Sequence, residues 1–290
     1  MSNILVSTDL TSSSDEAIKV ALIISGKFNL NIKVVHIHKG EKDKNVSYLF
    51  PDFENRLLEM KGLFRENLET QLEKHLKKFK QANHIVHGEI LFTSDIDEFD
   101  ELTERFSAQM VIVSKTNEEF DSYMGGAVSE RLIRTSKQNV LIVSKPTREI
   151  IDHILVPFSL NSFSLKAIEE AILFANKFSS KITLVHLHSH ENREETQLSS
   201  LAKSDEQTKM MEKINEKIFF LKEQNIFEDL RLEYCEYGKK EKLLTIIHQI
   251  NPGLVVMGAS RKKGLERFYL GSFCEFILRN GNTNILITKK

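Results

Sequence analysis

The sequence repeats itself once along its length, and this repeat constrains the fold more than any other feature. Three pairs of matching segments carry it: 4–6 with 154–156 and 32–38 with 182–188 at an offset of 150 residues, and 139–143 with 284–288 at an offset of 145. Matches that keep their order and share a register indicate two copies of one structural unit. A chain of 290 residues is long enough for two such units.

Within each copy, short β-branched runs alternate with segments of helical periodicity. Strands are expected near residues 4–7, 32–38, 85–92, 110–114 and 140–143, and again near 154–157, 182–188, 230–235, 254–257 and 285–287. After the first strand, Ala17, Ala21 and Ile24 form one apolar stripe, which returns as Ala167, Ala171 and Phe174. This alternation is typical of βαβ units and of a parallel sheet.

The two copies meet at a short polar segment, Lys145 to Glu149, which contains one proline. We therefore predict two domains, residues 1–146 and 150–290. Because the connection is short, we expect the two domains to pack against each other.

The net charge limits the kinds of partner that the protein is expected to bind, and the cysteines indicate the cellular compartment. Lysine and arginine number 40 against 41 acidic residues, so no overall field attracts nucleic acid or an anionic membrane. Cys235 and Cys274 have no paired ligand spacing and fit a reducing cytosol. Neither a signal peptide nor an apolar run of membrane length is visible. We expect a cytoplasmic protein that binds neither nucleic acid nor membrane.

The loop after the fourth strand of the second copy, residues 258–272, carries the strongest signal of a ligand. In an open parallel sheet, ligands bind beyond the carboxyl ends of the strands, where the winding direction reverses. Glycines let backbone amides approach a phosphate, and a helix that opens at Gly271-Ser272 and continues with Phe273 offers unpaired N–H groups. Four basic residues against one acidic residue give the loop a charge of +3. The loop therefore favours an anionic ligand such as a triphosphate.

This loop resembles the nucleotide-binding segment of the universal stress proteins, whose pattern is Gly-x2-Gly-x9-Gly-Ser/Thr. Gly258, Gly271 and Ser272 match it, with the same 12 residues between the two glycines, whereas Arg261 stands where the second glycine belongs. The resemblance covers the whole chain, once per copy. It implies two tandem Rossmann-like or flavodoxin-like α/β domains, each a five-stranded mostly parallel sheet with helices on both faces. It also implies an adenine nucleotide ligand, ATP or AMP, with or without Mg²⁺.

The family resemblance further implies that the two copies pair through their last strands as an internal pseudo-dimer. That pairing would be antiparallel and would join the segments 140–143 and 285–287. A further homodimer of the whole chain stays open.

The two copies match the family's site unequally. Asp9 matches the acidic residue that contacts the nucleoside in the family, whereas the second copy has Ser159 after Pro157. The loop of the first copy is two residues shorter and has a charge of −2 between Lys115 and Met124, which would repel phosphate. We expect the second copy to bind and the first to be degenerate. The predicted nucleotide residues are Pro157, Ser159, Val185, His186, Met257, Gly258, Arg261, Lys262, Gly264, Gly271, Ser272 and Phe273, with a weaker second set of Asp9, Val35 and His36.

The histidines of the second strands also suggest a metal site. His36 and His38 share one face of a strand, and so do His186, His188 and His190. Spacing alone does not make a ligand set, and we predict no metal. The resemblance instead places His36 and His186 beside the residue that meets the base.

Catalytic motifs are absent from the sequence: it has no nucleophile elbow, Walker-type loop or metalloprotease motif. We therefore expect a stress-response protein that acts by binding, without catalytic residues. Two alternatives stay open: an interaction scaffold that binds no nucleotide, and a slow ATPase.

Overall fold

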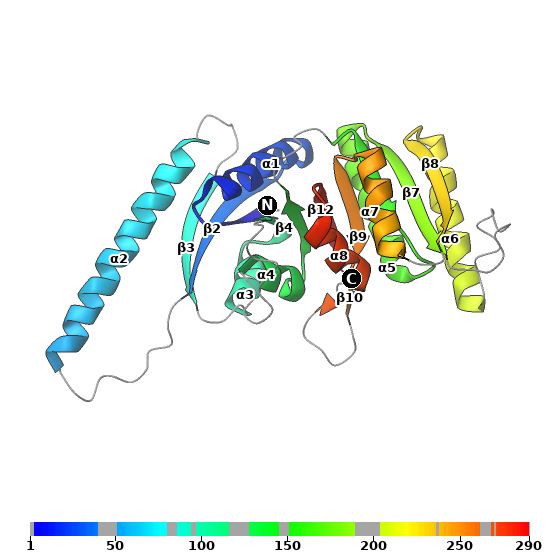
Figure 1. Ribbon diagram of the computed structural model, residues 1–290. Coiled ribbons are helices and arrows are strands. Elements are labelled where there is room, and N and C mark those ends of the chain that lie inside the picture. Colours follow the sequence, from blue (N-terminus) through cyan, green and yellow to red (C-terminus); the bar gives the residue numbers. More distant parts are fainter. Residues whose placement is uncertain are drawn as a thin grey trace. The chain divides into compact units, whose positions relative to one another are not determined.

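The chain forms two compact units, residues 1–114 and 115–290, and each combines parallel strands with helices (Figure 1). All ten predicted strands are present, within a few residues of their expected ends. Within the part of the chain that is described, no helix is both long and apolar enough to cross a membrane. The computed structural model describes residues 3–39, 51–79, 86–93, 97–115, 128–144, 151–188, 204–235, 238–261, 268–269 and 271–289.

The first unit holds four parallel strands in the order β3-β2-β1-β4. In β1, Ile4, Leu5 and Val6 are completely buried, as expected for a central parallel strand covered on both faces. The carboxyl end of β1 lies beside β2, with Thr8 opposite His36. The elements of this unit are β1 (Asn3–Thr8), α1 (Ser12–Phe28), β2 (Asn31–Lys39), α2 (Pro51–Lys77), β3 (Val86–Thr93), α3 (Asp97–Arg105) and β4 (Ala108–Ser114).

The main sheet of the second unit has six strands in the order β5-β12-β9-β6-β7-β8, all parallel except β5. Helices α5 and α6 pack together, and so do α7 and α8. Because right-handed crossovers run in opposite directions from β6, the two pairs cover opposite faces of the sheet. Its elements are α4 (Val128–Thr135), β5 (Asn139–Val143), β6 (His153–Pro157), α5 (Ser162–Phe178), β7 (Lys181–His188), α6 (Asp205–Glu223), β8 (Phe227–Tyr234), α7 (Lys239–Ile250), β9 (Leu254–Gly258), β10 (Ser260–Arg261), β11 (Phe268–Tyr269), α8 (Gly271–Asn280) and β12 (Asn284–Thr288).

Helix α5 forms as its sequence predicts. Its stripe of Ala167, Ala171 and Phe174 is buried against the sheet. At the start, the side chain of Asn161 accepts a hydrogen bond from the backbone N–H of Ser164 and so caps the helix. At the end, Ser179 takes the left-handed conformation, with φ 57°.

An antiparallel seam joins β5, the last strand of the first repeat, to β12, the last strand of the second. Leu286 lies opposite Leu141, and the three residue pairs of the seam are buried. Each strand also receives an equivalent hydrogen bond: Asn284 Oδ1 accepts from Ser144 N at 3.1 Å, and Asn139 Oδ1 accepts from Lys289 N at 2.9 Å. The predicted antiparallel pairing of the two last strands is therefore confirmed. The domain boundary near residues 146–150 stays a prediction, since α4 and β5 cluster with the second unit.

Two buried lysines stabilise helix ends within the second unit. Lys115 Nζ donates to the carbonyl oxygen of Gly281 at 2.8 Å and lies 3.4 Å from that of Arg279, at the carboxyl end of α8. Lys289 Nζ donates to Ile133 O near the end of α4. A cation at this end of a helix also meets the negative end of its dipole. Burial lowers the pKa of Lys115, but its ammonium has strong carbonyl partners.

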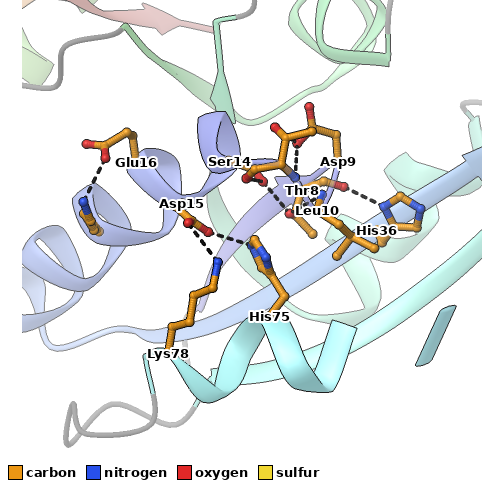
Figure 2. A network of polar contacts seen from close by, with 11 residues as sticks. Thr8, Asp9, Leu10, Ser14, Asp15, Glu16, His36, His75 and Lys78 are labelled. Carbon is orange, nitrogen blue, oxygen red and sulfur yellow. Dashed lines mark hydrogen bonds and ion pairs between the residues drawn. The ribbon is translucent and has the colours of Figure 1, made fainter. Parts of the chain in front are cut away.

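In the first unit, a cluster of three side chains links α1 to α2 (Figure 2). Asp15 lies between His75, whose Nε2 is 2.9 Å from Oδ1, and Lys78, whose Nζ is 3.2 Å from Oδ2. Burial lowers the pKa of His75, and the nearby Asp15 offsets this only in part. The folded chain therefore binds a proton at His75 less readily than the unfolded chain does.

We expect this cluster to make stability depend on pH. The contribution of neutral His75 is present above its ordinary pKa of 6.5 and is lost as the pH falls through the lower folded value. The loss is at most about 1.4 kcal/mol per pH unit, since one proton is involved. Urea unfolding of the first unit between pH 7.5 and 5 should show a shallower pH dependence in His75→Gln. Equal pH dependence in the two proteins would contradict the assignment.

Candidate functional site

The winding direction of the second repeat reverses between β6 and β9, which lie side by side with Ile154 opposite Leu254. The chain leaves β6 for α5 and β9 for α8, and these helices cover opposite faces of the sheet. The loops that follow the two strands therefore diverge from one point at the carboxyl edge of the sheet. This is the place where open α/β sheets bind ligands.

The backbone of Phe158, the first residue after β6, contacts β7 through both its N–H and its carbonyl group. Its N–H donates to Val185 O at 2.8 Å, and its carbonyl oxygen lies 2.9 Å from His186 Nδ1. The two rings also pack, with their centroids 5.2 Å apart. These contacts fix the position of His186 at the rim of the site and keep its ring half-buried.

The rest of the β6–α5 loop is held by its own polar groups. Ser159 N donates to Ser164 Oγ at 2.9 Å, and Ser159 O accepts from Asn161 N at 2.7 Å. The backbone of Ser159 is therefore engaged while the residue itself is exposed. Among the described residues its hydroxyl has no hydrogen-bond partner, so it is available to a ligand.

Gly258 ends β9 at a point where a side chain does not fit. A Cβ placed there would lie 2.4 Å from the carbonyl oxygen of Phe163, in the first turn of α5. The glycine thus allows the backbone of β9 to reach the start of α5. The sequence pattern favours this glycine for a phosphate, whereas the structure shows a packing reason for it, its close contact with the first turn of α5.

We expect Gly258→Ala to lower the free energy of unfolding of the second unit by about 1–3 kcal/mol, because rigid backbone must move to admit the methyl group. Urea unfolding measures this loss. Gly88→Ala is the matched control: its Cβ would meet the flexible ends of Leu76 and Leu72, which can move aside. An equal loss in the two variants would contradict the steric argument.

The long loop after β9 is closed at its base by a short hairpin that the sequence did not predict. Ser260 pairs with Tyr269 and Arg261 with Phe268, and the strand β11 packs near α4. Two predicted ligand residues, Lys262 and Gly264, lie outside the described residues. Gly271 and Ser272 open α8 as predicted, so the amino end of that helix follows the loop directly.

The first repeat has the same arrangement at the end of β1 (Figure 2). The carbonyl oxygen of Thr8 lies 2.9 Å from His36 Nδ1, the same distance as between the carbonyl oxygen of Phe158 and His186 Nδ1. Asp9 Oδ1 accepts hydrogen bonds from both the N–H and the hydroxyl of Thr11, at 2.9 and 2.6 Å. Burial acts to raise the pKa of Asp9, but these hydrogen bonds outweigh it and the pKa is lowered. Asp9 is therefore ionised at neutral pH.

The predicted residues of each repeat gather at one sheet edge, as far as they are described. Pro157 lies opposite Val185 in the β6–β7 register, and Met257 and Gly258 end the neighbouring strand β9. In the first repeat, Val35 and His36 lie opposite Ser7 and Thr8, next to Asp9. Whether any of them meets a ligand stays a prediction.

Sequence reasoning missed the residues that shape the β6–α5 loop, namely Phe158, Asn161 and Ser164. The Asn-x-x-Ser spacing before an apolar stripe is a helix-start signal and could have revealed the cap. No sequence signal reveals the contact of the Phe158 carbonyl with His186, since it joins residues 28 positions apart.

No metal-binding group of three His, Cys, Asp or Glu side chains occurs within the described ranges. His186 and His188 share a face, with ring centroids 6.5 Å apart, and His188 packs on Tyr234. Cys274 is buried, and burial raises the pKa of its thiol to about 12, so it stays protonated.

Comparison with known proteins decides the family. A model of the universal stress protein family matches residues 1–144 and 151–289. The chain belongs to the universal stress protein family. The resemblance found in the sequence and the α/β fold that it implied are thus confirmed.

Solved structures of the family share this fold across nearly the whole chain. A universal stress protein from Archaeoglobus fulgidus DSM 4304 has 18% identity and a TM-score of 0.71, covering 99% of this chain and 98% of its own. A putative universal stress protein from Pseudomonas aeruginosa UCBPP-PA14 has 14% identity and a TM-score of 0.63, with 99% and 92% covered. A protein of unknown function from P. aeruginosa PAO1 has 15% identity and a TM-score of 0.60, with the same coverage. None of the curated proteins compared with the sequence matches it significantly.

Proposed function

We propose that this universal stress protein binds ATP or another adenine nucleotide at the carboxyl edge of its second repeat. It would act by binding rather than by turnover, as a stress-response protein of the cytoplasm. The observation that carries the proposal is the switch point between β6 and β9, from which the basic loop and the β6–α5 loop both depart. We retain residues 1–146 and 150–290 as its two domains.

The phosphate side of the proposed site is the loop after β9 together with the start of α8. The segment 258–272 carries a charge of +3, and its last two residues, Gly271 and Ser272, begin α8. Phosphates are favoured by both features, because cations attract them and the N–H groups of a helix start can bind them. The predicted contacts here are Gly258, Arg261, Lys262, Gly264, Gly271, Ser272 and Phe273.

The nucleoside side of the proposed site is the rim formed by β6 and β7. Ser159 offers an exposed hydroxyl, and His186 offers a ring of fixed orientation. Pro157, Val185 and Met257 supply the apolar surroundings that a base needs. Mg²⁺ would arrive with the phosphates, since acidic ligands are scarce in the loop.

The first repeat is proposed to bind nucleotide weakly or not at all. The one basic residue of its corresponding loop, Lys115, is buried, and its ammonium group points to the carbonyl groups at the end of α8 instead of to the loop. The loop carries a charge of −2 between Lys115 and Met124, which would repel phosphate. The remainder of that loop lies outside the described residues.

A thermal unfolding titration with ATP tests the proposal. A ligand at 100 times its dissociation constant stabilises the folded state by about 2.7 kcal/mol. Gly271→Val should abolish this stabilisation, because a branched side chain would block the amino end of α8. Gly125→Val, the matched change in the first repeat, should leave it intact. Equal losses in the two variants would contradict a single site in the second repeat.

The two alternative functions give different results in the same assays. A scaffold that binds no nucleotide would show no thermal shift at millimolar ATP. A slow ATPase would release phosphate, and Gly271→Val would remove that release.

A further inference from the structure

The imidazole of His186 is held in one tautomer. Its Nδ1 lies 2.9 Å from the carbonyl oxygen of Phe158, and a carbonyl oxygen can only accept a hydrogen bond. Nδ1 therefore carries a hydrogen. Burial lowers the pKa of this ring, the hydrogen bond to Phe158 raises it in part, and the neighbouring His188 and Lys239 lower it again, so that the pKa is lowered overall. The ring is therefore neutral at neutral pH, and its Nε2 carries a lone pair instead of a hydrogen.

The lone pair of Nε2 is not used by any of the residues that the structure describes. The ring is half-buried at the carboxyl end of β7, beside the exposed Ser159. Among the polar groups of an organic ligand, an acceptor of fixed orientation can form a hydrogen bond only with a donor. A phosphate or carbonyl oxygen in the same place would be repelled, because its lone pairs would face the lone pair of Nε2.

We infer that His186 selects the nucleoside part of the ligand, with Nε2 accepting a hydrogen bond from an N–H or O–H group. The inference rests on the nucleotide binding proposed above. Two groups of ATP have this chemistry: the exocyclic amino group of adenine and the hydroxyl groups of ribose. A purine with a carbonyl in place of that amino group, as in inosine triphosphate, presents an acceptor at that position and carries its N–H at the neighbouring ring nitrogen instead.

The two nitrogens of the ring have separable roles. The Nδ1 contact recurs in the first repeat, where His36 lies 2.9 Å from Thr8 O, so it serves to clasp the second strand to the end of the first. If the histidine served only to connect these two strands, no hydrogen-bond acceptor would be needed at the position of Nε2. An asparagine at position 186 distinguishes the roles, because its amide can donate to Phe158 O but offers nothing at the place of Nε2.

Calorimetric titration of the full chain with three nucleotides tests the inference. We expect unaltered protein to bind ATP at least tenfold more tightly than inosine triphosphate. His186→Asn should weaken ATP binding about tenfold, so that the affinities for ATP and inosine triphosphate become nearly equal. Its melting temperature without ligand should stay close to that of the unaltered protein. If a ribose hydroxyl is the donor, deoxyadenosine triphosphate will show the discrimination instead. His248→Asn, a control at an exposed position of α7 outside the predicted site, should leave all three affinities unchanged.

A second measurement needs no variant. With isotope-labelled histidine, nitrogen NMR of the unaltered protein should show His186 Nε2 unprotonated and its resonance should move on addition of ATP. An unmoved resonance in ATP-bound protein, or unchanged ATP affinity and selectivity in His186→Asn, would overturn this inference and leave the proposed function standing. Failure of unaltered protein to bind any of the three nucleotides would overturn both.

Discussion

Leu286→Ala should lower the free energy of unfolding of the second unit by about 2–5 kcal/mol, as measured by urea unfolding. Leu286 lies in the middle of β12 and is completely buried, with Leu141 of β5 directly opposite. Shortening the side chain removes apolar contacts and leaves a cavity in a seam of two strands that cannot close the gap without losing their register.

The control for this change is Leu173→Ala, which shortens a leucine that is 53% exposed on α5. We expect that variant to stay within about 0.5 kcal/mol of the original protein. Leu141→Ala should resemble Leu286→Ala, and the double variant should depart from additivity by about 0.5–3 kcal/mol because the two side chains face each other. Strict additivity would show that they do not share a cavity.

Phe174→Ala should cost the second unit about 3–5 kcal/mol of unfolding free energy, the range found when a buried aromatic ring is removed. Phe174 is 1% exposed on α5, and its ring stacks on Phe178 with centroids 6.0 Å apart. Helix α5 also contacts β6, β9 and β12, so the cavity would lie under the element that begins at the proposed site.

Phe219→Ala is the matched control, since this phenylalanine is 64% exposed on α6. Urea unfolding should separate the two variants by several kcal/mol. A similar loss in both would mean that Phe219 is covered in solution. Weaker ATP binding in Phe174→Ala alone would further show that α5 positions the β6–α5 loop.

The strands were predictable because each of them has a characteristic pattern within a few consecutive residues. Short β-branched runs such as 4–6 and 154–156 are buried on both sides, and their repetition at a fixed offset made each match support the other. The antiparallel seam followed from the family resemblance and not from pattern. The same local reasoning could not foresee the hairpin of β10 and β11, whose two strands have only two residues each.

The site was predictable in outline and less so in its contacts. Gly258 and Gly271 stand where the glycine pattern placed them, at the end of β9 and the start of α8. Lys115 looked like a loop charge in the sequence, whereas its ammonium group binds carbonyls 164 and 166 positions away. No window along the sequence contains such a contact, because burial and the partner both come from the tertiary fold.

The position of β5 gives the first repeat a reason to persist even where it binds no ligand. Strand β12 is buried along all five residues and pairs with β9 on one side. Without β5 its other side would be an apolar sheet edge with unpaired N–H and C=O groups, which is a template for aggregation with other chains. The first repeat thus protects this edge through its last strand, and loss of that strand should appear first as insolubility.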